Sequence, residues 1–210
     1  MNGVSRLMTQ RNKAATSVLA ALMIHGRKGK MGIAPDFDWM AGMLSYIDEI
    51  VRGQHYRDEE ACLLKPLERR MPELRPKLAR ARRDHIGSGG YCVRMAEALA
   101  HWRGGWDKAI DMYLDNARDH YRLSASHGRL MRTTILPAAE RCFTEAQWQP
   151  AAAAYARSED PVARSQRRAE YEAALCRRMG RQKPPQAAAR HIDPDQGPGA
   201  HAKPSFTSLS

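Results

Sequence analysis

Long helix-forming stretches are the feature that most constrains how this chain folds. Up to about residue 180 the sequence is rich in Ala, Leu, Met, Arg and Glu, while proline, glycine and β-branched residues are sparse. Such residues favour helices, and no segment shows the strict alternation of polar and apolar residues that is typical of a strand. The sequence therefore predicts an all-α fold.

Apolar residues at helical spacing divide the chain into long helices joined by short turns. A stripe containing Met8, Leu19 and Leu22 predicts the first helix over residues 4–26. Capping residues, prolines and a Gly-Gly pair mark where the other helices begin and end. These are expected over residues 37–67, 72–102 and 106–141, followed by a short helix after a capping box at Thr144 and a charged helix over 161–179. Long helices with short turns predict an up-and-down four-helix bundle.

The last part of the chain has a different composition. From Gly180 onward it is rich in Pro, Gly and Ala and carries no apolar stripe, which is typical of a disordered tail. We therefore expect a bundle over residues 1–160, a C-terminal helix over 161–180 and a disordered tail over 181–210. Within the bundle, the Gly-Ser-Gly-Gly sequence at 87–90 predicts either a bend or a close helix–helix approach.

The formal net charge of +11 is carried mainly by arginines scattered over several helices. A surface for nucleic acid or for an acidic partner would explain this charge, and so would solvated helix faces. Because the basic residues are not interleaved with aromatic residues, the pattern disfavours nucleic acid. A protein partner or a homodimer stays open.

Cysteine usage and the N-terminal sequence bear on where the protein works. Its four cysteines are dispersed without a CxxC pair, as expected for reduced, partly buried thiols in the cytoplasm. The apolar run AATSVLAALMI is too short to span a bilayer, and HGRKGK follows it where a signal peptide would have small residues. The sequence predicts a cytoplasmic protein with no membrane partner.

His55 and Glu59 lie four residues apart, so on a helix both side chains occupy one face. Helical bundles build metal sites from inward-facing histidines and carboxylates, which suit iron, zinc or manganese. A single pair of this kind is a weak signal. The alternative is a solvated histidine beside an ion-paired glutamate.

Three segments of the chain carry a resemblance to a known family. They are HYRDEEACLLKPLERRMPE, ARRDHIGSGG and SHGRLMRTTILPAAERCFTEAQW. They resemble the second, third and fourth helices of hemerythrin-like proteins, the HHE cation-binding domains, and the similarity extends over about residues 8–157. This resemblance implies that His55, Glu59, His85 and His127 occupy metal-ligand positions.

The sequence departs from the family pattern at other ligand positions. Met131 and Arg132 stand where the family has a bridging carboxylate, and Asn12 stands where its first helix carries a histidine. The family's di-iron centre would therefore be incomplete here. Three histidines and a glutamate still suit one non-haem iron or zinc ion. The alternative is a metal-free descendant that acts as an interaction or regulatory module through its basic surface.

The resemblance implies a role in sensing or handling iron, oxygen or reactive species, but not reversible oxygen carriage. The sequence shows no nucleophile–base pair, phosphate loop or paired carboxylates that would favour an enzyme. His120 precedes His127 by two helical turns, roughly 10.5 Å, which is too far to share one ion. We expect His120 to be a core-edge histidine with a hydrogen-bonded partner.

Overall fold

The computed structural model describes residues 3–157. Within this range the chain is helical and contains no strand, which confirms the all-α prediction. The helix expected over 161–179 and the tail expected over 181–210 lie outside the described residues. No helix in the described range is long and apolar enough to cross a membrane.

The first helix, α1, spans Gly3–Lys30 and so continues beyond the predicted end at residue 26. The extra turn lies against neighbouring helices, and glycines make this approach possible. A Cβ atom on Gly26 would lie 2.7 Å from Leu114 Cδ2, and one on Gly29 would overlap the Trp102 ring. The chain turns just after α1 at Gly32, whose φ of +84° favours glycine. The predicted end of the first helix at residue 26 is therefore wrong, because Gly26 and Gly29 allow the last turn of α1 to pack against its neighbours.

The second long segment is helical from Phe37 to Arg70, close to the predicted range of 37–67. It begins after Asp36, whose side chain accepts a hydrogen bond of 2.9 Å from the Trp39 N–H. Its backbone alternates between α-helical and wider π-helical turns. The successive elements are α2 (Phe37–Tyr46), π-helix η1 (Ile47–His55), α3 (Tyr56–Glu59), π-helix η2 (Glu60–Leu64) and α4 (Lys65–Arg70).

The chain reverses at Met71 through a 3₁₀ turn, η3 (Pro72–Leu74), and then forms α5 (Arg75–Arg103). Helix α5 runs without interruption through the Gly-Ser-Gly-Gly sequence. A Cβ on Gly87 would lie 3.2 Å from Leu123 Cδ2, and one on Gly89 would lie 3.0 Å from Arg52 Cδ, so side chains of neighbouring helices pack over these glycines.

The last helices of the described range begin after Gly105, which has a φ of +92°. Helix α6 (Ala109–Leu130) continues through π-helix η4 (Met131–Ile135) into α7 (Leu136–Cys142), close to the predicted range of 106–141. Helix α8 (Glu145–Arg157) follows. The Thr144 N–H donates a hydrogen bond of 2.8 Å to Gln147 Oε1, as expected for one half of a capping box.

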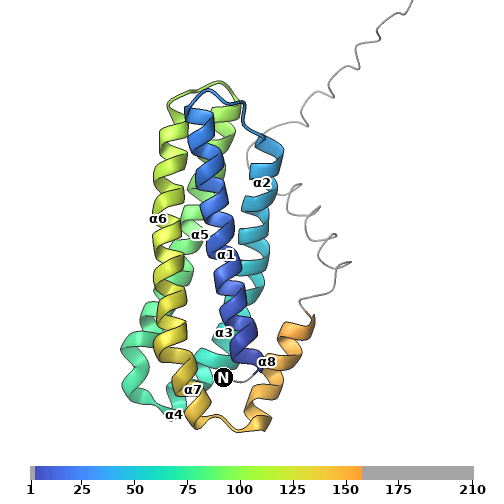
Figure 1. Cartoon of the computed structure of the whole chain (residues 1–210). Coiled ribbons are helices and arrows are strands. Elements are labelled where there is room, and N and C mark those ends of the chain that lie inside the picture. The colour runs from blue at the N-terminus through green and yellow to red at the C-terminus, as the bar shows by residue number, and fades with distance from the viewer. Residues whose placement is uncertain (1–2, 158–210) are drawn as a thin grey trace, which may run out of the picture.

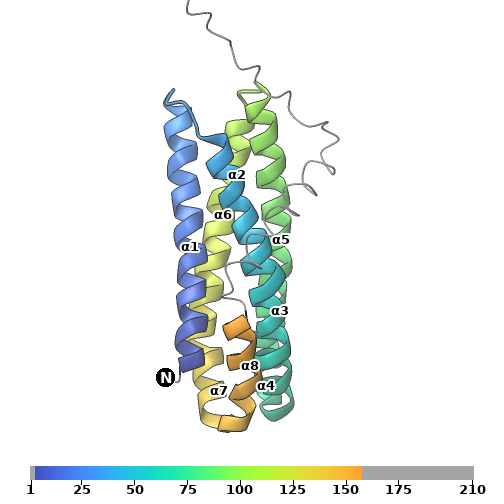
Figure 2. The ribbon, with the colours of Figure 1, turned by 90° about the vertical axis from the view of Figure 1, so that its right-hand side faces the viewer.

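The long helices lie side by side along one axis (Figures 1 and 2). Helix α6 packs along both α1 and α5, while the α2–η1 segment contacts α1 and α5 from the other side. Helix α8 lies near the end of the molecule where α4 and α7 are found, and it contacts α1 and η2. The arrangement places residues from several helices around a shared interior.

That interior consists of two apolar clusters with a polar layer between them. One cluster includes Met8, Leu63 and Leu130, and the other includes Ala15 and Val51. Buried polar side chains occupy the intervening turns of each long helix. This polar layer contains Asn12, His55, Glu59, Asp84, Ser88, His120, Ser124 and His127.

Candidate metal centre

Three residues of the polar layer lie at or near π-helical turns. His55 is the last residue of η1, and Glu59 is the residue directly before η2. His127 lies one turn before η4 begins at Met131. A π-helical turn shifts the following side chains around the helix axis, and such turns occur frequently at functional sites. Between these turns, the α-helical segment α3 keeps His55 and Glu59 one helical turn apart on the same face.

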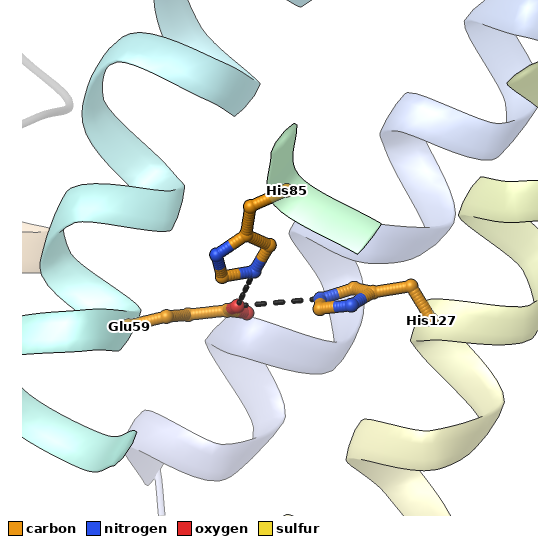
Figure 3. Close-up of side chains that lie close together, drawn as sticks. All are labelled: Glu59, His85 and His127. Atoms are coloured by element: carbon orange, nitrogen blue, oxygen red, sulfur yellow. Dashed lines mark hydrogen bonds and ion pairs between the residues drawn. The ribbon is translucent and has the colours of Figure 1, made fainter. Parts of the chain in front are cut away.

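Glu59 is the centre of this layer, and its side chain is completely buried. Its Oε2 atom lies 3.1 Å from His85 Nε2 and 3.3 Å from His127 Nε2 (Figure 3). Its Oε1 atom lies 2.9 Å from His55 Nε2. The four residues that the resemblance implies as ligands therefore meet at one carboxylate, although they come from three helical segments.

The two oxygens of Glu59 face different partners. His85 and His127 approach Oε2, and the ligand atoms of these three residues all lie within 4.8 Å of one another. His55 approaches Oε1, where it also lies 3.3 Å from Asn12 Oδ1. Glu59, His85 and His127 thus form the compact set, and His55 contacts the opposite side of the carboxylate.

Asn12 and Met131 occupy buried positions next to this set. Asn12 Nδ2 lies 3.5 Å from Glu59 Oε1, so the first helix contributes an amide to the centre. Met131 belongs to the apolar cluster near Leu130 and is 1% exposed. Neither residue adds a negative charge to the centre.

Sequence reasoning missed two residues of the centre. Asp84 Oδ2 lies 3.6 Å from His127 Nδ1, on the side of the imidazole that faces away from Glu59. The ring of Tyr56 stacks on that of His85, with centroids 3.8 Å apart and planes 11° apart. A signal for Asp84 was present, since it continues the buried stripe of α5 at helical spacing. The stripe comprises Leu78, Ala81, Asp84, Ser88, Cys92 and Met95.

The charges of the centre are strongly coupled. Burial by itself raises the pKa of Glu59, but the charge of His55 and the hydrogen bonds with the histidines hold that pKa well below its usual range. Burial lowers the pKa of His127. The contacts with Asp84 and Glu59 have the larger, opposite effect, so this pKa is raised to about 9. In the metal-free protein, Glu59 is therefore a carboxylate and His127 carries a proton at neutral pH.

His120 lies outside this set. It is buried, and its Nε2 atom lies 2.8 Å from Ser88 Oγ, which in turn accepts a hydrogen bond of 3.5 Å from the Tyr56 hydroxyl. The prediction of a core histidine with a hydrogen-bonded partner is confirmed. Burial, with a smaller contribution from the positive charge of Arg94, lowers the pKa of His120 to about 4.

The spacing of the compact set suits a small metal ion. In a tetrahedral site with bonds of about 2.0–2.1 Å, ligand atoms lie about 3.4 Å apart. The distances of 3.1 and 3.3 Å from Glu59 Oε2 to the two histidine nitrogens are close to this value, and the ligand atoms of the two histidines lie within 4.8 Å of each other. One carboxylate and two imidazoles form a ligand set that suits zinc or iron.

Comparisons with family profiles, with curated protein sequences and with solved structures give no match. The hemerythrin-like resemblance therefore stays a prediction, and the function is argued from the geometry of the centre.

Proposed function

We propose that this chain binds one divalent transition-metal ion, iron or zinc, through Glu59, His85 and His127. The observation that carries the proposal is the convergence of the three ligand atoms in a buried layer between two apolar clusters. Histidines at such a centre must be neutral to bind metal, so the ion would replace the proton of His127. His55 and Asn12 would hold the other oxygen of the Glu59 carboxylate.

His85 is the least buried member of the compact set. Its side chain is 12% exposed, whereas those of His127 and Glu59 are 2% and 0% exposed. The shortest way for an ion to reach the centre is therefore past His85, where the stacked Tyr56 ring limits how far the imidazole can turn.

As part of the same proposal, we assign the fold to the up-and-down four-helix bundle of the hemerythrin-like family. The support is that the ligands come from separate long helices, as in carboxylate–histidine centres of helical bundles. A cytoplasmic role in sensing or handling iron, oxygen or reactive species would follow. With Met131 and Asn12 in place of a carboxylate and a histidine, one ion fits the ligand set better than two.

Metal content and thermal stability test the proposal. The protein, purified without a tag or chelator, is expected to contain near-stoichiometric iron or zinc by elemental analysis. Adding Zn(II), or Fe(II) without oxygen, to metal-free protein should raise its melting temperature, because an ion bound only by the folded state stabilises it by about 2.7 kcal/mol at one hundred times its dissociation constant. A His85→Ala, His127→Ala double variant should show neither effect.

The matched control is His101→Gln, which changes an exposed histidine on the same helix as His85. This variant should bind metal like the unmodified protein. If the unmodified protein contains no metal and neither ion changes its melting temperature, the proposal is wrong.

A metal-free interaction module is the second candidate function. The observation that favours it is that Glu59 already has polar partners on both oxygens, so this carboxylate is satisfied without a metal ion. The net charge of +11 would then serve an acidic partner. Binding of such a partner should weaken steeply as salt concentration rises, whereas metal binding should depend much less on salt.

A further inference from the structure

We infer that Asp84 is a positioning residue of this centre, which orients His127 toward the ion and supplies a second buried negative charge. The inference rests on the proposed function, because it concerns how that metal site is supported. Asp84 is not among the residues that the ligand pattern implies, and its oxygens are not in the compact set of ligand atoms.

The geometry separates the roles of Asp84 and Glu59. His127 presents Nε2 to Glu59 Oε2 at 3.3 Å and Nδ1 to Asp84 Oδ2 at 3.6 Å. The two carboxylates therefore lie on opposite edges of one imidazole ring. A metal-binding histidine commonly donates its second ring N–H to a carboxylate, which fixes both the tautomer and the ring orientation. Asp84 occupies the place of that carboxylate.

The separation of 3.6 Å is slightly longer than a hydrogen bond. Asp84 Oδ2 and His127 Nδ1 are both buried, and neither has a hydrogen-bond partner within the described residues. A small rotation of the imidazole toward Asp84 would satisfy both atoms at once. The same rotation would fix the direction in which Nε2 points.

The charge balance of the layer supports the second part of the inference. Glu59 and Asp84 are the buried acidic side chains of the polar layer. Buried charges need compensation, because transfer of a lone carboxylate out of water is very costly. A divalent cation bound by neutral His85 and His127 would place positive charge beside both carboxylates. Removing the charge of Asp84 would take away one of these two negative charges.

Asp84 is distinguished from a plain surface acid by its surroundings. Asp119, an aspartate on α6, pairs instead with arginines: it lies 3.8 Å from Arg118 and 3.5 Å from Arg122. The ion-pair partner of Asp84 in the described chain is His127. Its carboxylate is thus directed at a proposed ligand.

Zinc affinity of a series of variants, measured by competition with a chelator, tests the inference. Asp84→Asn keeps an oxygen that can accept the Nδ1–H of His127 but removes the charge, and Asp84→Ala removes both. We expect Asp84→Asn to weaken zinc binding about tenfold and Asp84→Ala about 100-fold. Asp84→Glu should restore part of the affinity, and Asp119→Asn, the matched control, should leave it unchanged.

Proton NMR provides a readout that needs no metal. In the metal-free protein, the Nδ1–H of His127 should give a slowly exchanging downfield resonance that Asp84→Ala abolishes. If that resonance is unaffected and all variants bind zinc equally, the inference is wrong while the proposed function stands. If the unmodified protein binds neither zinc nor iron, the proposed function fails, and the Asp84 role at a metal site is overturned with it, whatever the resonance shows.

Discussion

Replacing Glu59 by glutamine should lower the free energy of unfolding of the metal-free protein by about 3–5 kcal/mol. The substitution keeps the volume of the side chain but removes its charge and turns one acceptor oxygen into a donor NH₂. Histidines that approach both oxygens would then face a neutral amide, and His127 would lose one of its two buried carboxylate partners. Urea unfolding at pH 7, followed by far-UV circular dichroism, measures the difference.

The matched control is the neighbouring residue. Glu60 is partly exposed and pairs with Arg82 at 2.9 Å. Because such pairs contribute little in water, Glu60→Gln should cost about 1 kcal/mol or less. Glu59→Gln should also abolish zinc binding, since it removes the charged member of the compact set. Equal stabilities of the Glu59→Gln and Glu60→Gln variants would contradict the central role of the carboxylate.

The sequence was sufficient for the helices because their signals are local. Apolar spacing, the Asp36 cap and the Gly105 turn lie within a few residues of the features they determine. Where the prediction was wrong, at the end of α1, a contact distant in the chain decided the outcome. Gly26 and Gly29 signal a loop by composition, but they are retained in a helix because α6 and the Trp102 ring pack against them.

The candidate centre was predictable only in part. Family resemblance and helical spacing pointed to His55, Glu59, His85 and His127, and these four residues do meet in the structure. Spacing cannot say which oxygen of Glu59 each histidine approaches, because that depends on side-chain torsions and on how the helices pack. The buried stripe of α5 indicates that Asp84 faces the interior, but its role depends on its distance from His127, which spacing along one helix does not give.

His120 should make the protein less stable in mild acid. Its pKa is lowered from 6.5 to about 4 by burial and, to a smaller extent, by Arg94. The unfolded chain therefore takes up a proton at a higher pH than the folded protein does. Stability should fall as pH drops from 6.5 to 4, and this residue alone should account for a loss of about 3 kcal/mol. The loss should be complete below pH 4.

Other groups also titrate in this range, so the test compares variants across pH. Glutamine at position 120 keeps an oxygen near Ser88 Oγ but has no titratable nitrogen. Urea unfolding between pH 7 and pH 4 should show a smaller loss of stability for His120→Gln than for the unmodified protein, by about 3 kcal/mol at the acidic end. His101→Gln, which changes an exposed histidine, should follow the unmodified profile. Parallel profiles for His120→Gln and the unmodified protein would mean that His120 is protonated equally in both states, contrary to the effect of its burial.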